Sequence, residues 1–311
     1  MRRRQIIAWM FATGVLAASS LGHAIMRRHD VPDVEYVVEA QTYPQIVDLL
    51  SPGDCLGTLI APTWLLTAAH CAAHLPGGHR ISIAGADHEV EGVVCHPSYD
   101  GDEHDLALVK LVQAVEDVTP LPLYRQTDEK GQHVLFVGRG DTGNGHQGQR
   151  RSINDGQTRA ATNTVSATEQ PWLEFVFHEP GQAGITDLEG LSGDGDSGGP
   201  ALIDTPQGLA VAGVSSWQDA RRRKIGKYGA HDFYARVSTD LEFIDAVTAD
   251  DWDGEFRDCP KEGCQCDLDG PAGAPPVALV LVCLGLGARR RRPRARVHRS
   301  RTRDHHPPRQ K

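Results

Sequence analysis

The sequence predicts an all-β protein whose folded part closes with one short helix. Between residues 45 and 237, short apolar runs alternate with turns rich in Gly, Pro and Asp, which is the pattern of antiparallel strands. The clearest runs cover residues 55–60, 64–67, 106–111, 133–137, 172–177 and 209–215. Helix-period patterns are scarce before residues 239–242, which have the form of a capping box, and Leu241, Ile244 and Val247 then follow at helical spacing.

Two polar segments interrupt the strand-rich region. Residues 124–130 are expected to separate two lobes, about 25–125 and 131–250, and residues 140–159 are rich in Gly, Asn and Gln and are expected to form a long loop. The acids Asp87, Glu89 and Glu91 alternate along the chain. We favour one exposed strand face for them over a calcium-binding loop, because alternation is the signature of a half-buried strand.

The first 24 residues have the composition of a signal peptide. A basic start, residues 1–4, precedes an apolar run over 6–21, and small residues at 22–24 match a signal-peptidase site. An uncleaved membrane anchor is the alternative. We expect export, to the extracellular space or the cell surface, where disulfide bonds are chemically permitted.

The composition changes again after residue 250. Residues 251–270 form an acidic, Cys-containing stalk, 271–288 a short apolar segment, and 289–311 a basic tail that begins with four arginines. The Cys-x-Cys pair, the apolar segment and the arginines resemble the C-terminal sorting tails of bacterial surface proteins, especially the myxobacterial type. A plain membrane anchor is the alternative, so residues 264–292 are expected to contact a membrane or a sorting machinery.

Charge excludes one class of partner. The formal net charge of −9 combines two basic ends with a strongly acidic body, and such a body repels the phosphates of nucleic acids. The histidines His88, His96 and His104 lack the helical spacing of metal ligands and are expected to be solvated or hydrogen-bonded. We therefore expect no cofactor, no metal and no nucleic acid, and a monomer.

Three short motifs carry the chemistry. Gly195–Pro200 places Ser197 between an acid and two glycines, residues 67–71 contain His70, and residues 105–108 begin with Asp105. A serine hydroxyl needs a base and an orienting acid to act as a nucleophile. Glycines free the backbone, so that the amides of Gly195 and Ser197 can point at one spot, where an oxyanion would form.

The order His70, Asp105, Ser197, with these flanking residues, resembles the trypsin/chymotrypsin-like serine peptidases over about residues 25–250. The resemblance implies two packed six-stranded antiparallel β-barrels with a C-terminal helix packed on the second barrel. It implies a serine endopeptidase acting on proteins or peptides, with His70 as base and Asp105 as its orienting acid. A catalytically inactive binding module on the same fold is the alternative, although such members usually lack the histidine or the serine.

The same resemblance assigns a specificity pocket. Leu191, six residues before the nucleophile, stands where trypsin-like enzymes carry an aspartate, with Ser192 beside it. Ser216 and Trp217 occupy a strand edge that would pair with the substrate backbone. Gln218 replaces a wall glycine and should narrow the entrance, whereas Asp232 on the opposite side could pair with Arg or Lys. The pocket is therefore predicted to accept Arg or Lys, or else a smaller and less polar residue.

Family members are activated by a free amino terminus. In active members, the free α-ammonium of an amino-terminal Ile or Val forms an ion pair with the acidic residue before the nucleophile. In this sequence that acidic residue is Asp196. Signal cleavage after Ala24 would create that terminus at Ile25, so we expect an Ile25–Asp196 ion pair. A flexible start with Ile25 unburied is the alternative.

Among the seven cysteines, one pairing follows from the resemblance. Cys55 and Cys71 match a family disulfide beside the histidine, whereas other family bridges are replaced by Val134 with Ile203 and by Gly193. Cys95 has no obvious partner and is expected to be a small buried hydrophobe. The remaining cysteines lie beyond the expected domain and their pairing is left open: Cys259, Cys264, Cys266 and Cys283.

Overall fold

A computed structural model of the chain describes residues 24–150, 155–219 and 225–261. Nearly all of the predicted signal peptide, residues 262–270 of the Cys-containing stalk, the apolar segment and the basic tail lie outside the described residues. Within the part described, no helix is both long and apolar enough to cross a membrane.

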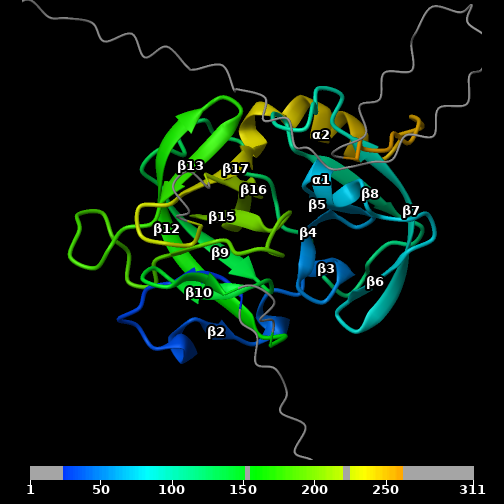
Figure 1. The fold of residues 1–311 in the computed structure, drawn as a ribbon. Helices are drawn as coiled ribbons and strands as arrows, with labels where there is room; N and C mark the ends of the chain where they lie inside the picture. Colours follow the sequence, from blue (N-terminus) through cyan, green and yellow to red (C-terminus); the bar gives the residue numbers. More distant parts are fainter. Residues whose placement is uncertain (1–23, 151–154, 220–224, 262–311) are drawn as a thin grey trace, which may run out of the picture. The chain divides into compact units, whose positions relative to one another are not determined.

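Two six-stranded antiparallel β-barrels form the body of the protein, as the sequence predicts (Figure 1). In the first barrel β3 is followed by β4, β5, β8, β7 and β6, and β6 lies beside β3, which closes the ring. These strands are β3 (Ile46–Ser51), β4 (Asp54–Ala61), β5 (Trp64–Thr67), β6 (Arg80–Ile83), β7 (Ala86–Cys95) and β8 (Ala107–Leu111).

The second barrel closes through direct strand pairing, since β13 bonds both to β12 and to β17. Its strands are β9 (His133–Gly138), β12 (Thr158–Glu169), β13 (Trp172–Val176), β15 (Pro200–Thr205), β16 (Gly208–Gln218) and β17 (His231–Arg236). The short strand β2 (Val37–Val38) adds to the outer edge of β12. The expected apolar pair is confirmed, because Val134 lies opposite Ile203 in the β9–β15 ladder.

A separate four-stranded sheet joins the start of the chain to the pocket region. Its order is β11 (Gly148–Arg150), β10 (Thr142–Asn144), β1 (Met26–Arg27) and β14 (Gly190–Leu191). Residues 140–159 are therefore not one long loop as predicted, because β10 and β11 form a hairpin within them. The hairpin exists because β1 offers β10 a strand to pair with, which local composition does not reveal.

The strand alternation expected around Asp87 is present. In β7 the side chains of Asp87, Glu89 and Glu91 are exposed, whereas Val90 is buried. Arg80 on the neighbouring strand lies within 3.8 Å of Asp87 and 3.7 Å of Glu89. This is a solvated strand face.

The predicted closing helix is α2 (Leu241–Thr248), but its start differs from the capping box. Asp240 is the residue before the helix, and neither it nor Thr239 caps it with a side chain. Thr239 lies instead in a short 3-10 helix (Val237–Thr239) and its hydroxyl donates to Arg236 O. Ile244 and Val247 enter a core cluster built largely from the first barrel, so the helix does not pack on the second barrel alone.

The cysteines correct one prediction and confirm another. Cys55 in β4 is bonded to Cys71 in α1 (Ala69–Ala72), as the resemblance implied. Cys95, expected to have no partner, is bonded to Cys259, which therefore lies on the folded body rather than beyond it. The two residues are 164 apart in sequence, and their pairing depends on the path that the chain takes after α2.

Residues 252–259, which follow α2, lie against the first barrel, and we call this segment the strap. The backbone of Arg257 makes two hydrogen bonds to β7. Its N–H donates to Val93 O at 2.8 Å, and its carbonyl accepts from Cys95 N at 2.9 Å. The Trp252 ring meets Trp64 edge-on at 5.2 Å. The Phe256 ring covers Gly92, where a Cβ atom would come within 2.5 Å of it. Packing therefore continues well beyond residue 250.

We expect truncation after Lys261 to leave the stability of the domain unchanged, and truncation after Asp250 to lower it. The shorter form loses the Cys95–Cys259 bond and the strap, and loss of a native disulfide alone costs about 2–5 kcal/mol. Thermal and denaturant unfolding of both forms would measure the difference. Cys259→Ser in the longer form separates the bond from the packing, and equal midpoints for all three proteins would contradict the expectation.

Candidate active site

His70 and Asp105 form a bidentate pair in the first barrel. His70 lies on α1, directly after β5, and Asp105 lies two residues before β8, the strand that pairs with β5. His70 Nδ1 is 2.7 Å from Asp105 Oδ2, and the His70 backbone N–H donates to Asp105 Oδ1 at 2.9 Å. Two bonds to one carboxylate fix the orientation of the imidazole.

Asp105 has a third donor, from the second barrel. Ser216 Oγ–H donates to Asp105 Oδ2 at 2.6 Å. Ser216 is the extra residue of a β-bulge, because Ser215 and Trp217 face consecutive residues of β17, and bulges re-aim side chains. Burial alone would raise the pKa of Asp105, but the bonds from His70 and Ser216 hold it below its ordinary value.

The role of Ser216 as a partner of Asp105 is not foreseen by sequence reasoning, which places it only on the substrate edge. A bulge in β16 is the signal, and it becomes visible only once the pairing register with β17 is known.

Ser197 sits on a tight turn that only glycines permit. Gly195 and Gly198 have φ angles of 93° and 80°, which other residues rarely adopt. A Cβ atom on Gly198 would lie 2.2 Å from Leu56 O. The turn is pinned to both barrels, since Ser197 O accepts from Leu56 N at 2.7 Å and Gly198 N donates to Ser215 O at 2.8 Å.

The peptide before Gly195 has a defined direction. The carbonyl of Asp194 accepts a bond from Asp141 N–H at 2.5 Å. Because a trans peptide is planar, the N–H of Gly195 points away from Asp141. Gly195, Ser197 and His70 line one cavity of about 610 Å³, together with His74 and Leu50. His74 is a further residue that sequence reasoning missed, and its only signal is its spacing of four from His70.

Asp196 is a buried carboxylate held by four backbone amides. Oδ1 accepts from Arg139 N and Gly140 N, and Oδ2 accepts from Gly193 N at 2.9 Å and from Ile25 N at 3.2 Å. Burial raises the pKa of this carboxyl to about 6 despite these donors. Ile25 is itself buried, and here its nitrogen is a peptide nitrogen because the chain continues to Ala24.

The neighbouring pocket, of about 160 Å³, is lined by much of the predicted set. Its lining residues are Ser192, Gly193, Asp194, Ser197, Ser215, Ser216, Trp217, Gln218 and Ile225. The Gln218 side chain bonds to two separate segments around the pocket. Its Nε2 donates to Ser192 O at 2.5 Å, and its Oε1 accepts from Gly226 N at 3.2 Å. The Trp217 ring stacks on Phe233 at 4.1 Å.

Two predicted pocket residues lie behind this surface. Leu191 is fully buried and packs in the second core cluster with Ile25, Met26 and Tyr234, because β14 pairs with β1. Asp232 is also fully buried. Its Oδ2 accepts from Ser192 N–H and Oγ–H at 2.9 and 2.8 Å, and burial raises its pKa to about 7. Asp232 therefore does not line the pocket itself, but it is hydrogen-bonded to Ser192, which does.

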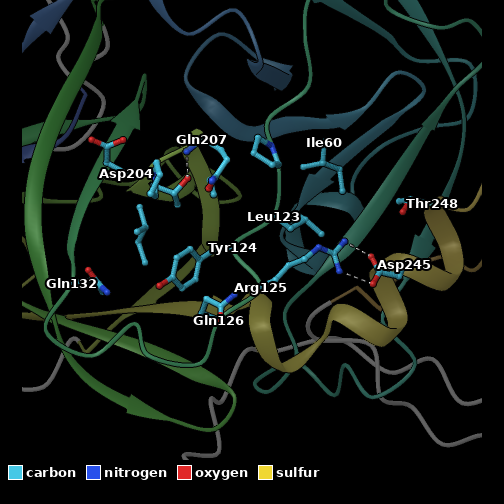
Figure 2. Close-up of a pocket in the computed structure, with 15 residues that line it drawn as sticks. Ile60, Leu123, Tyr124, Arg125, Gln126, Gln132, Asp204, Gln207, Asp245 and Thr248 are labelled. Carbon is cyan, nitrogen blue, oxygen red and sulfur yellow. Dashed lines mark hydrogen bonds and ion pairs between the residues drawn. The ribbon is translucent and has the colours of Figure 1, made fainter.

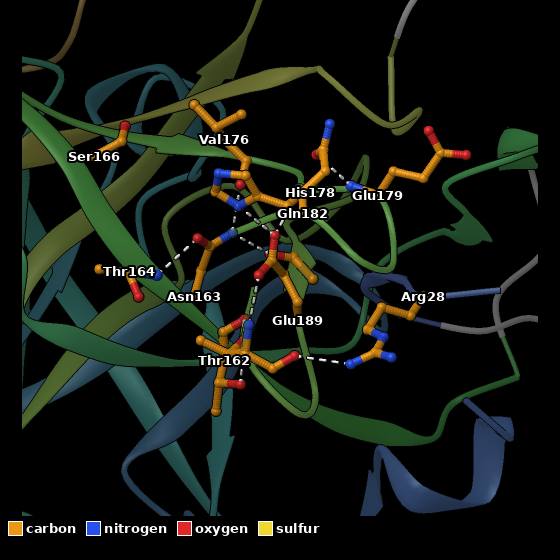
Figure 3. A network of polar contacts seen from close by, with 12 residues as sticks. Arg28, Thr162, Asn163, Thr164, Ser166, Val176, His178, Glu179, Gln182 and Glu189 are labelled. Carbon is orange, nitrogen blue, oxygen red and sulfur yellow. Dashed lines mark hydrogen bonds and ion pairs between the residues drawn. The ribbon is translucent and has the colours of Figure 1, made fainter. Parts of the chain in front are cut away.

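A polar network braces the segment that leads into β14 (Figure 3). Glu189, fully buried, accepts from the backbone and ring N–H of His178 and from Thr186 N. Asn163 donates to Gly190 O at 2.9 Å, and Arg28 donates to Thr186 O at 3.0 Å. These bonds connect the segment to β12 and to Arg28, directly after β1, and thereby fix the position of the chain that leads to Ser192 in the pocket.

A family model described as Trypsin matches residues 36–244, well over half of the chain. The chain belongs to the trypsin family. Among solved structures, it resembles neuropsin, a serine protease expressed in the limbic system of mouse brain. That match has a TM-score of 0.53 and 18% identity, and covers 69% of this chain and 98% of neuropsin. At this identity it shows the fold alone.

Another cavity of this trypsin-family chain lies away from Ser197 (Figure 2). It measures about 670 Å³ and is bounded by residues 122–126, residues 203–207 and the C-terminal helix α2. Arg125 and Asp245 close one side with a bidentate ion pair at 2.7 and 2.9 Å. No His, Ser or Cys lines it, so it lacks the serine and histidine that line the cavity at Ser197.

Two described clusters could be considered as metal sites. In one, Cys55, His70 and Cys71 come together, but the two sulfurs are bonded to each other. In the other, His96, His104 and Asp240 are neighbours. Ser98 N–H donates to His96 Nδ1, so Nε2 carries the proton and faces Asp240. His96 and His104 also stack in parallel, and both rings place a nitrogen near Asp240 Oδ1.

Proposed function

We propose that this trypsin-family chain is an exported serine endopeptidase that hydrolyses peptide bonds through an acyl-enzyme. One observation carries the proposal: His70, hydrogen-bonded to the buried Asp105, lines the same cavity as Ser197. A base oriented by an acid, and a serine on a tight turn of the same cavity, are the groups that nucleophilic acyl transfer requires.

In the proposed mechanism, Ser197 Oγ attacks the scissile carbonyl while His70 Nε2 takes its proton. Asp105 accepts from His70 Nδ1–H, which leaves Nε2 as the acceptor and stabilises the imidazolium. His70 then donates the proton to the leaving amine. Water repeats the sequence on the acyl-enzyme and releases Ser197.

The oxyanion of the tetrahedral intermediate is proposed to bind at the N–H groups of Gly195 and Ser197. The bond from Asp141 to Asp194 O supports this, because it turns the Gly195 N–H away from Asp141. Amides fixed in advance cost no reorganisation during the reaction. The substrate backbone is proposed to lie along the edge formed by Ser216, Trp217 and Gln218.

Proteins or peptides are the proposed substrates, and the acidic body makes nucleic acid an unsuitable ligand. We propose that the enzyme works as a monomer without a cofactor. Attachment to a membrane or sorting machinery through residues 264–292 stays a prediction, because those residues lie outside the described chain.

A catalytically inactive binding module is the competing function, and covalent labelling separates the two. We expect a fluorophosphonate probe to label the parent protein at Ser197 and to leave Ser197→Ala unlabelled, because only an activated serine reacts readily. Intact mass measures the adduct. Ser51→Ala, at an exposed serine, is the matched control and should label like the parent. A folded parent that takes no label would support the binding module.

The pocket is proposed to accept Arg or Lys through Asp232. Because burial raises the pKa of this carboxyl to about 7, it gains its negative charge as the pH rises through about 7. We expect the parent's kcat/KM on an Arg peptide, relative to that of Asp232→Asn, to grow about fivefold to tenfold from pH 6 to pH 8, as the ionised fraction rises from about a tenth to about nine-tenths.

A peptide with Ala before the scissile bond serves as the control, since it carries no charge for Asp232 to pair with and the ratio should stay flat. Equal kcat/KM values for parent and Asp232→Asn on Arg peptides would remove Asp232 from this role. Gln218 spans the pocket, so a parent preference for Ala would assign the pocket to small residues instead.

Activation is proposed to require a free amino group at Ile25. Among the described residues, the buried Asp196 carboxylate accepts hydrogen bonds from backbone N–H groups alone, and a free ammonium would add the positive charge that a buried carboxylate needs. We expect protein beginning at Ile25 to exceed a form that retains Ala24 by at least about tenfold in kcat/KM, a gain that well-ordered donors can provide.

N-terminal sequencing of active protein checks the start, and Asp196→Asn should remove the advantage of the free terminus. Full activity in the form that retains Ala24, or an active protein that begins elsewhere, would rule this activation out.

A further inference from the structure

A hydrogen-bonded cluster lies directly behind Asp105. His104, the preceding residue, places its Nδ1 2.8 Å from Asp240 Oδ1. His96, which follows β7, places its Nε2 3.4 Å from the same oxygen. Three separate parts of the chain thus meet at one carboxylate: the end of β7, the segment before β8 and the start of α2.

The backbone at His104 needs an external restraint. Its φ angle is 53°, and the left-handed region is unfavourable for a residue with a Cβ atom. The His104 carbonyl accepts from Leu106 N at 2.7 Å, and Leu106 O accepts from His96 N at 3.0 Å. These bonds curl the chain tightly around Asp105, so the His104 conformation decides the direction in which the Asp105 side chain leaves the backbone.

Asp240 is a firm anchor for that restraint. Its side chain is only 2% exposed, and its backbone carbonyl accepts from Ile244 N at 3.0 Å in the first turn of α2. The His104 ring stacks on the His96 ring with centroids 4.6 Å apart and planes within 6°, and Phe243 of α2 meets the His96 ring edge-on at 4.6 Å. The His104 ring therefore cannot turn away freely.

We propose that His104 and Asp240 are positioning residues for Asp105, holding the left-handed turn that presents its carboxylate to His70. Asp105 must receive the His70 backbone N–H, the His70 ring N–H and the Ser216 hydroxyl at once. A change in the turn of a few tenths of an ångström weakens all three bonds together, and small misplacements are costly in catalysis. The proposal rests on the proposed peptidase function.

Three substitutions of His104 separate the effect of its backbone conformation from the effect of its side-chain hydrogen bond to Asp240. His104→Gly keeps the positive φ without strain but removes the bond to Asp240. His104→Asn tolerates the positive φ and places an amide nitrogen at the position of Nδ1, so that it can still donate to Asp240. His104→Ala provides neither feature. Asp240→Ala removes the acceptor from the other side.

We expect His104→Gly to lower kcat about tenfold with KM little changed, His104→Ala to lower it further, and His104→Asn to restore most of the loss. His104→Gly combined with Asp240→Ala should be no worse than the poorer single variant, because both break one bond. Asp245→Ala, which breaks the exposed pair with Arg125 on the same helix, is the matched control and should keep the parent kcat.

A second readout does not depend on turnover. The proton between His70 Nδ1 and Asp105 should give a far-downfield NMR resonance, expected to broaden or move upfield in His104→Gly and to return in His104→Asn. An unchanged resonance and kcat in His104→Gly would overturn the proposal. So would an equal loss in His104→Gly and His104→Asn, or losses that follow the fall in thermal midpoint alone. A parent that shows the resonance but takes no fluorophosphonate would refute the peptidase function and leave the positioning role testable by NMR.

Discussion

The buried Asp196 carboxylate is the interaction on which the functional geometry depends. It takes backbone N–H bonds from Ile25, Arg139, Gly140 and Gly193, which lie directly before β1, directly after β9 and in the turn before the nucleophile. An isolated buried carboxylate costs several kcal/mol, so these segments are held around it. Space for the carboxylate comes from glycine: a Cβ atom on Gly138 would lie 2.4 Å from Asp196 Oδ1.

The candidate site also depends on how the two barrels meet. The first barrel supplies His70 and Asp105, and the second supplies Ser197 and Ser216. Ser216 donates to Asp105 across this boundary, and the core cluster of the first barrel includes apolar residues of β15, β16, β17 and α2. The barrels therefore share a packed core, and the site inherits its precision from that core rather than from the loops.

Much of the fold and of the site was predictable because its signals are local. Strand alternation and the spacing of Leu241, Ile244 and Val247 report which face of each element is buried, and the all-β class and the helix α2 follow from them. The glycines around Ser197 report a turn that other residues cannot make. The sequence by itself therefore determined the fold class, the family and the three candidate catalytic side chains.

Only the tertiary structure decided the contacts between residues that are far apart in sequence. The Cys95–Cys259 bond and the His104–Asp240 pair join positions 164 and 136 residues apart, and no periodicity encodes such distances. Thr239 also shows why the predicted capping box was wrong: it lies in a 3-10 helix, and its hydroxyl donates to Arg236 O instead of capping α2. Leu191 turned into the core because β14 pairs with β1. The physical reason is common to all of these: packing fixes side-chain direction, and local sequence does not.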